Sequence, residues 1–168
     1  MVPKQVLTWL TENHYGQILK TQPVSGGCIN NGTRLVTDSG NSFFLKTNAH
    51  CPPDMFAKEA EGLKSLTIPE GPRIPKSLLF GSGFLLLEDL CPASRIPDYW
   101  LVLGRQLATL HNQTASQFGF SHDNYLGNTP QPNPWMGDGF NFFAEHRLIY
   151  QAELARQRRY LSSKEVQG

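Results

Sequence analysis

Short apolar runs separated by turn-forming residues fill the first ninety residues of the chain. Such runs are typical of β-strands, and the tight turns between them are typical of hairpins. Residues 38–41 (Asp-Ser-Gly-Asn) and 81–83 (Gly-Ser-Gly) have this turn chemistry. The predicted strands are Arg34–Thr37, Ser42–Thr47, Lys76–Phe80 and Phe84–Leu87.

Apolar residues at helical spacing predict four helices. They cover Val6–Asn13, Asp54–Leu66, residues 98–112 and Asn141–Lys164. The third carries Trp100, Leu103, Leu107 and Leu110 on one face, and a loop rich in Gly, Asn and Pro over residues 118–139 separates it from the fourth. The change in character near residues 91–97 predicts a strand-rich part over residues 1–92 and a helical part over residues 93–168.

The composition is that of a globular domain without a strong charge bias. The 168 residues are 39% hydrophobic and 17% charged, which is enough for a buried core. A net charge of +1 gives no reason to expect nucleic acid or a membrane surface, and no apolar run resembles a signal peptide or a membrane span. Three cysteines without a Cys-x-x-Cys pair argue against a disulfide framework or zinc site and favour a cytoplasmic location.

One lysine and one glutamate stand where apolar side chains would be expected. On a helical wheel, Glu59 falls between Leu63 and Leu66, inside the apolar stripe of its helix. A carboxylate on a buried face is costly unless a cation or hydrogen-bond donors meet it. Lys46 is the candidate partner, because it shares a face with Phe44 on a strand that carries apolar residues on both faces. The alternatives are a glutamate at the rim and a lysine that reaches solvent from the strand end.

The segment Val24–Val36 (VSGGCINNGTRLV) fits either a plain hairpin or a backbone cradle for a phosphate. It does not match G-x-G-x-x-G, but it precedes two strands, the lysine and the helix with the inward glutamate. This is the order of parts in a protein-kinase-like nucleotide lobe. The apolar strand that ends at Glu88 and Asp89 fits the next part, a hinge whose backbone holds adenine, although an exposed strand end is the alternative.

Together these segments resemble the fructosamine kinase (ketosamine 3-kinase) family. The resemblance extends from about residue 4 to 160 and is carried by SGGCINNGTRLVTDSGNSFFLKTN, MFAKEAEGLKSL, FLLLEDL, LGRQLATLHN, FGFSHDNYLGNTPQPN and FFAEHRL. It implies a protein-kinase-like two-lobe fold of the α+β class, with an antiparallel-sheet nucleotide lobe at 1–92 and the first helices of a C-terminal lobe at 93–168. It also implies ATP-dependent phosphorylation of a sugar hydroxyl of ketosamines (protein deglycation), with ATP and Mg²⁺ as cofactors.

The same resemblance implies a set of ATP-binding residues. Lys46 would contact phosphate oxygens, and Glu59 would hold the lysine in place. The phosphate loop would be residues 26–30 and the adenine hinge residues 88–90. The full set is Gly26, Gly27, Cys28, Ile29, Asn30, Lys46, Glu59, Glu88, Asp89 and Leu90.

The family's catalytic His-Gly-Asp-Leu-Trp segment and its later metal-binding aspartate do not occur in the 168 residues. We therefore expect an N-terminal portion of a fructosamine kinase that is inactive alone, with its Mg²⁺ ligands outside this chain. The alternatives are a non-catalytic nucleotide-binding or association module and an aminoglycoside- or choline-type phosphotransferase, against which the FGF and NTPQ stretches argue. The expected partners are ATP and a ketosamine, with self-association through exposed apolar helix faces or through Cys28.

Overall fold

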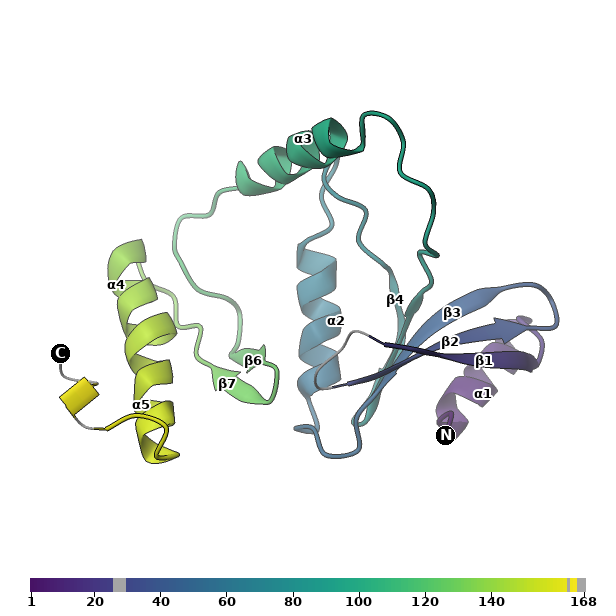
Figure 1. The fold of residues 1–168 in the computed structure, drawn as a ribbon, viewed down its shortest axis with the longest axis horizontal. Coiled ribbons are helices and arrows are strands. Elements are labelled where there is room, and N and C mark those ends of the chain that lie inside the picture. Colours follow the sequence, from purple (N-terminus) through teal and green to yellow (C-terminus); the bar gives the residue numbers. More distant parts are fainter. Residues whose placement is uncertain (26–29, 163, 166–168) are drawn as a thin grey trace. The chain divides into compact units, whose positions relative to one another are not determined.

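The computed structural model describes residues 1–25, 30–162, 164 and 165. These residues form two compact units, Met1–Gln113 and Thr114–Gly168, whose elements are drawn in Figure 1. The helix α3 (Tyr99–His111) groups with the first unit. The division into compact units does not test the predicted lobe boundary between residues 92 and 93, which stays a prediction.

A five-stranded antiparallel sheet in the order β1-β2-β3-β5-β4 forms the centre of the first unit. The strands are β1 (Ile18–Val24), β2 (Asn31–Thr37), β3 (Ser42–Thr47), β4 (Ser77–Gly81) and β5 (Phe84–Glu88). The predicted strand Ser42–Thr47 is confirmed at both ends, and the predicted pairing of β4 with β5 forms. The sequence does not single out β1, because this edge strand is mostly exposed and contains Pro23.

Each face of the sheet packs against a different helix (Figure 1). On one face, α1 (Lys4–Glu12) buries Val6 and Leu10 against the sheet. On the other, α2 (Met55–Ser65) buries Phe56 and Ala60 against β5. Both faces of β3 take part in this packing, as the apolar residues on both of its faces predict. The α1-side cluster contains Leu35, Phe43, Leu45, Phe84 and Leu86, and the α2-side cluster contains Leu85 and Leu87 with Phe44 packed against it.

The predicted amphipathic helix over residues 98–112 forms as α3, but none of its residues is buried. Trp100 is 65% exposed and Leu101 53% exposed. The guanidinium of Arg95 lies over the ring of Trp100, 5.0 Å from its centroid. The apolar spacing therefore predicts the helix correctly, whereas its apolar side chains stay largely open. None of the helices in the described ranges is long and apolar enough to cross a membrane.

The second unit joins a short hairpin to a continuous helical segment. The hairpin consists of β6 (Asn124–Leu126) and β7 (Thr129–Gln131), so the prediction of a loop over residues 118–139 is wrong for these six residues. The helical segment consists of α4 (Gly139–Phe143), the π-helix η1 (Ala144–Ile149) and α5 (Tyr150–Gln157). It ends before the predicted Lys164, because Arg159 takes a left-handed conformation (φ 62°) that terminates a helix.

A buried polar cluster connects the hairpin region to the helical segment. Asn133 is 4% exposed, and its backbone N–H donates to Asp123 Oδ1 over 2.8 Å. The guanidinium of Arg147 donates to the Pro132 carbonyl (2.7 Å) and to Asn133 Oδ1, and it lies over the Phe142 ring. Burial lowers the pKa of Arg147 below its ordinary value. Two of the segments that carry the family resemblance, FGFSHDNYLGNTPQPN and FFAEHRL, therefore meet in this cluster.

Candidate nucleotide-binding site

A cavity of about 860 Å³ opens on the α2 side of the sheet. Its volume lies within the usual range of small-molecule sites. The described residues of the predicted ATP-binding set all line it, namely Asn30, Lys46, Glu59, Glu88, Asp89 and Leu90. The other predicted residues, Gly26, Gly27, Cys28 and Ile29, lie outside the described residues.

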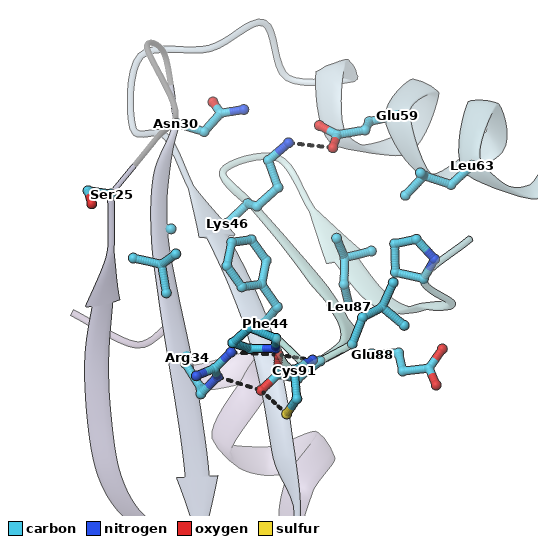
Figure 2. Close-up of a pocket in the computed structure, with 16 residues that line it drawn as sticks. Ser25, Asn30, Arg34, Phe44, Lys46, Glu59, Leu63, Leu87, Glu88 and Cys91 are labelled. Carbon is cyan, nitrogen blue, oxygen red and sulfur yellow. Dashed lines mark hydrogen bonds and ion pairs between the residues drawn. The ribbon is translucent and has the colours of Figure 1, made fainter. Parts of the chain in front are cut away.

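Lys46 and Glu59 form an ion pair in this cavity, with Lys46 Nζ 2.5 Å from Glu59 Oε1 (Figure 2). The alternation of β3 places Lys46 on the same face as Phe44, and the turn of α2 places Glu59 three residues after the buried Phe56. The side chains are 24% and 28% exposed, so the pair stands at the border between the core and the cavity. The contact predicted from the sequence is confirmed, and its part in ATP binding stays a prediction.

Asn30 marks the end of the predicted phosphate loop, beside the same pair (Figure 2). Its side-chain Oδ1 accepts a hydrogen bond of 3.1 Å from Asn48 Nδ2. Asn48 directly follows β3, and the backbone register pairs Asn31 with Thr47. The C-terminal end of the loop is therefore tied to the strand that carries Lys46.

The two acidic residues at the end of β5, Glu88 and Asp89, use their side chains to bind other residues of the protein. Arg73 donates to Glu88 Oε1 over 2.5 Å, and this hydrogen bond holds the pKa of Glu88 below its ordinary value. Arg34 donates to Asp89 through Nε (2.6 Å) and Nη2 (3.3 Å). The Asp89 side chain is only 4% exposed, so the alternative of an exposed strand end is wrong for this residue. Because both carboxylates are engaged in this way, the backbone and the apolar surface near residues 88–90 are what remains for contact with a ligand.

The charge state of Asp89 follows from these contacts. Burial raises the pKa of its carboxyl, whereas hydrogen bonds from Arg34, Cys91 and Ser42 together lower it by more, so the pKa lies below its ordinary value. The bond to Asp89 in turn raises the pKa of Arg34. The pair is ionised at neutral pH.

Sequence reasoning missed Arg34, although a signal for it was present. Arg34 is opposite Phe44 in the β2–β3 register, and Gly32 is opposite Lys46, so Arg34 shares the cavity face with the lysine. Arg34 is thus a second basic residue on the sheet face that carries Phe44, which is the kind of anomaly that identified Lys46. The alternation of β2 could therefore have pointed to it.

A five-stranded antiparallel sheet, whose lysine pairs with a glutamate from the adjacent helix beside a cavity, has the architecture of a protein-kinase-like N-terminal lobe. A sequence model of one family, described as fructosamine kinase, matches residues 2–167. The chain belongs to this family. The family and the α+β, kinase-like fold predicted from the sequence are thus confirmed.

The chain is similar to curated kinases and to solved structures. It is 43% identical to a probable ketoamine kinase of Synechocystis, over 84% of this chain and 50% of that protein. It is 40% identical to the chloroplastic protein-ribulosamine 3-kinase of Arabidopsis thaliana, over 88% and 47%. A putative fructosamine-3-kinase from Thermobifida fusca shares the fold, with a TM-score of 0.81 and 24% identity. The match covers 99% of this chain and 59% of that structure's chain. The chain spans about half the length of these curated relatives.

Proposed function

We propose that the cavity binds ATP and that the whole protein transfers its terminal phosphoryl group to a sugar hydroxyl of a ketosamine. The substrate class is taken from relatives whose names describe ketoamine and ribulosamine kinases. The nucleotide is taken from the kinase family and from the fit of the cavity. The chain would then be the nucleotide-binding part of an enzyme that removes glycation adducts.

The cavity has an apolar part and a charged part, as a nucleotide requires. Phe44, Leu63 and Leu87 line it with apolar surface suited to a flat base. Lys46 supplies a compact ammonium that suits phosphate oxygens, and Glu59 fixes its position. In this proposal Asn30 closes the phosphate loop, and the backbone of residues 88–90 contacts the base.

The Lys46–Glu59 pair is the observation that carries the proposal. A partly buried ion pair is weak evidence for stability, because apolar residues of similar size usually serve a core equally well. Here it lies in the lining of a cavity with room for a ligand, which favours a binding role. Mg²⁺ would arrive with the ATP phosphates and neutralise part of their charge. No described residue is assigned as its ligand, and none is assigned as the catalytic base.

A calorimetric titration of Mg-ATP into the 168-residue chain tests the binding step. We expect one site, and we expect Lys46→Met to weaken binding at least about tenfold, because a charge-assisted contact to phosphate is lost. Lys64→Met is the matched control, since Lys64 is an exposed lysine on the same helix as Glu59 and outside the cavity. Absence of binding by the unmodified chain, or equal binding by Lys46→Met, would contradict the proposal.

A non-catalytic nucleotide-binding module is the second candidate, because the cavity and the Lys46–Glu59 pair support binding of a nucleotide without by themselves supporting phosphoryl transfer. Incubation with radiolabelled ATP and a fructosylated lysine separates the two candidates. Phosphoryl transfer by the whole protein supports the kinase. Binding without transfer in that protein supports the module.

A further inference from the structure

A second ion pair lies in the same cavity, away from the first. Figure 2 shows Asn30 and the Lys46–Glu59 pair at one end and Arg34 and Cys91 at the other, with Phe44 between them. The register places Arg34 two residues along β2 from Gly32, which is opposite Lys46. Two residues of strand correspond to about 7 Å. If phosphates bind at Lys46, the Arg34 end is the one left for the base.

The Asp89 carboxylate joins Arg34 to the segment after β5. Arg34 donates to both carboxylate oxygens. From the other side, the backbone N–H of Cys91 donates to Oδ1 over 3.1 Å and the Cys91 thiol donates to Oδ2 over 3.3 Å. Both oxygens are therefore occupied, and the side chain is almost fully buried. The Asp89 carboxylate therefore holds the backbone at Cys91 and has no oxygen left to contact a ligand.

The backbone at Cys91 needs this support. Its φ is +41°, in the left-handed region that residues with a Cβ rarely adopt, at a cost of about 1 kcal/mol or more. Such a conformation persists only when the surroundings enforce it. An aspartate that accepts from the N–H two residues later does so by forming an Asx-turn. Arg34 holds the aspartate, and the aspartate holds the turn that lines the cavity.

We infer that Arg34 is a positioning residue for the base of the nucleotide, because it fixes, through Asp89, the turn at residues 89–91 and with it the backbone of residues 88–90 against which the base is read. The inference rests on the proposed ATP-binding function. It assigns no phosphate contact to Arg34, since the guanidinium is engaged by Asp89. A backbone edge recognises a purine by its hydrogen-bond pattern, so loss of the turn lowers the discrimination between bases.

Calorimetric titration with ATP and with ITP, which differ in the base and share the phosphates, tests this inference. We expect the unmodified chain to prefer ATP and Arg34→Met to bring the ratio of the two dissociation constants at least about fivefold closer to one. Lys46→Met should weaken both ligands and leave the ratio unchanged. Arg105→Met is the control, because Arg105 is exposed on α3 and outside the cavity.

The action through Asp89 has its own test. In an Asp89→Ala background, Arg34→Met should change neither the ATP affinity nor the ratio further. Asp89→Asn, which keeps an acceptor for the Cys91 N–H, should retain more of the preference than Asp89→Ala. An unfolded fraction lowers the number of sites per chain and does not change the ratio, so poor folding is not mistaken for the effect.

The outcomes separate this inference from the proposed function. If the unmodified chain binds neither nucleotide, the proposed function fails and the inference falls with it. If the chain binds ATP but shows no preference over ITP, the base is not read by this turn. If Arg34→Met weakens both ligands equally, Arg34 serves the phosphates or the fold, and the inference alone is overturned.

Discussion

The Lys46–Glu59 pair predicts a non-additive effect on ATP affinity. We consider Glu59→Gln and Lys46→Met, singly and together. Glutamine keeps the size of the side chain but removes its charge, so the lysine loses the partner 2.5 Å away and becomes free to sample other rotamers. Ordering a lysine side chain costs up to about 2 kcal/mol. If ATP must supply most of that ordering, Glu59→Gln should weaken binding by about tenfold.

The pair's exposure sets the expected size of the coupling. Ion pairs at the surface contribute about 0.2–1 kcal/mol to folding stability. Removal of one partner from a buried pair lowers folding stability by about 3–5 kcal/mol. Side chains that are 24% and 28% exposed lie between these cases, so we expect a coupling energy of about 1–2 kcal/mol. In the Lys46→Met background the glutamate has no lysine to hold, and Glu59→Gln should have almost no further effect on ATP affinity.

The assay is isothermal titration of ATP into the four chains at one Mg²⁺ concentration and ionic strength. Asp54→Asn supplies the control, because Asp54 pairs with Lys58 at 3.1 Å beside the same helix and neither residue lines the cavity. The reasoning is refuted if Glu59→Gln weakens binding by the same factor with Lys46 and with Met at position 46. Equal factors would mean that the carboxylate acts on the nucleotide independently of the lysine.

Four further results are expected. Leu86→Ala, at a side chain with no exposure, should lower the free energy of unfolding by about 2–5 kcal/mol in urea titrations. Because the pKa of Asp89 is lower in the folded state, its contribution to stability should be complete above the ordinary carboxyl pKa. This contribution should fall as the pH drops through the lower folded-state pKa, and Asp89→Asn should remove this part of the acid dependence of stability. Gly119→Ala should destabilise the second unit by about 2–3 kcal/mol, because the φ of Gly119 is +130° and a Cβ there would lie 2.5 Å from the Pro134 carbonyl oxygen. Gly137→Ala is the control and should not destabilise the unit, because a Cβ at Gly137 would meet open space. The chain should self-associate at micromolar concentrations in sedimentation experiments, and Trp100→Ser, at a side chain 65% exposed, should reduce the association.

The parts of the site that could be predicted are those set by local periodicity. A strand repeats every two residues and a helix every 3.6, so the faces of Lys46 and Glu59 follow from their own neighbours in the sequence. Their meeting then requires only that the helix cover the strand face that carries Phe44. The helix does pack there, through Phe56 and Ala60.

The parts that could not be predicted depend on strand order or on weak local signals. Arg34 and Asp89 are 55 residues apart, and they meet because β5 pairs with β3 while β2 pairs with the other edge of β3. No local period encodes that order. The short hairpin β6–β7 is hidden for a different reason, since its turn-rich composition is equally typical of an irregular loop.

The alternation of β3 gives the fold and the site a common origin. Phe43 and Leu45 point to the face that α1 closes, where the cluster is apolar and tightly buried. Phe44 and Lys46 point to the face that α2 covers in part, and the cavity opens there. A slip of one residue in the register would place the lysine in the closed core and two apolar side chains in the cavity. The burial of a charge in the α1 cluster would be prohibitive, so the lysine that we assign to ATP also specifies the register of the sheet that presents it.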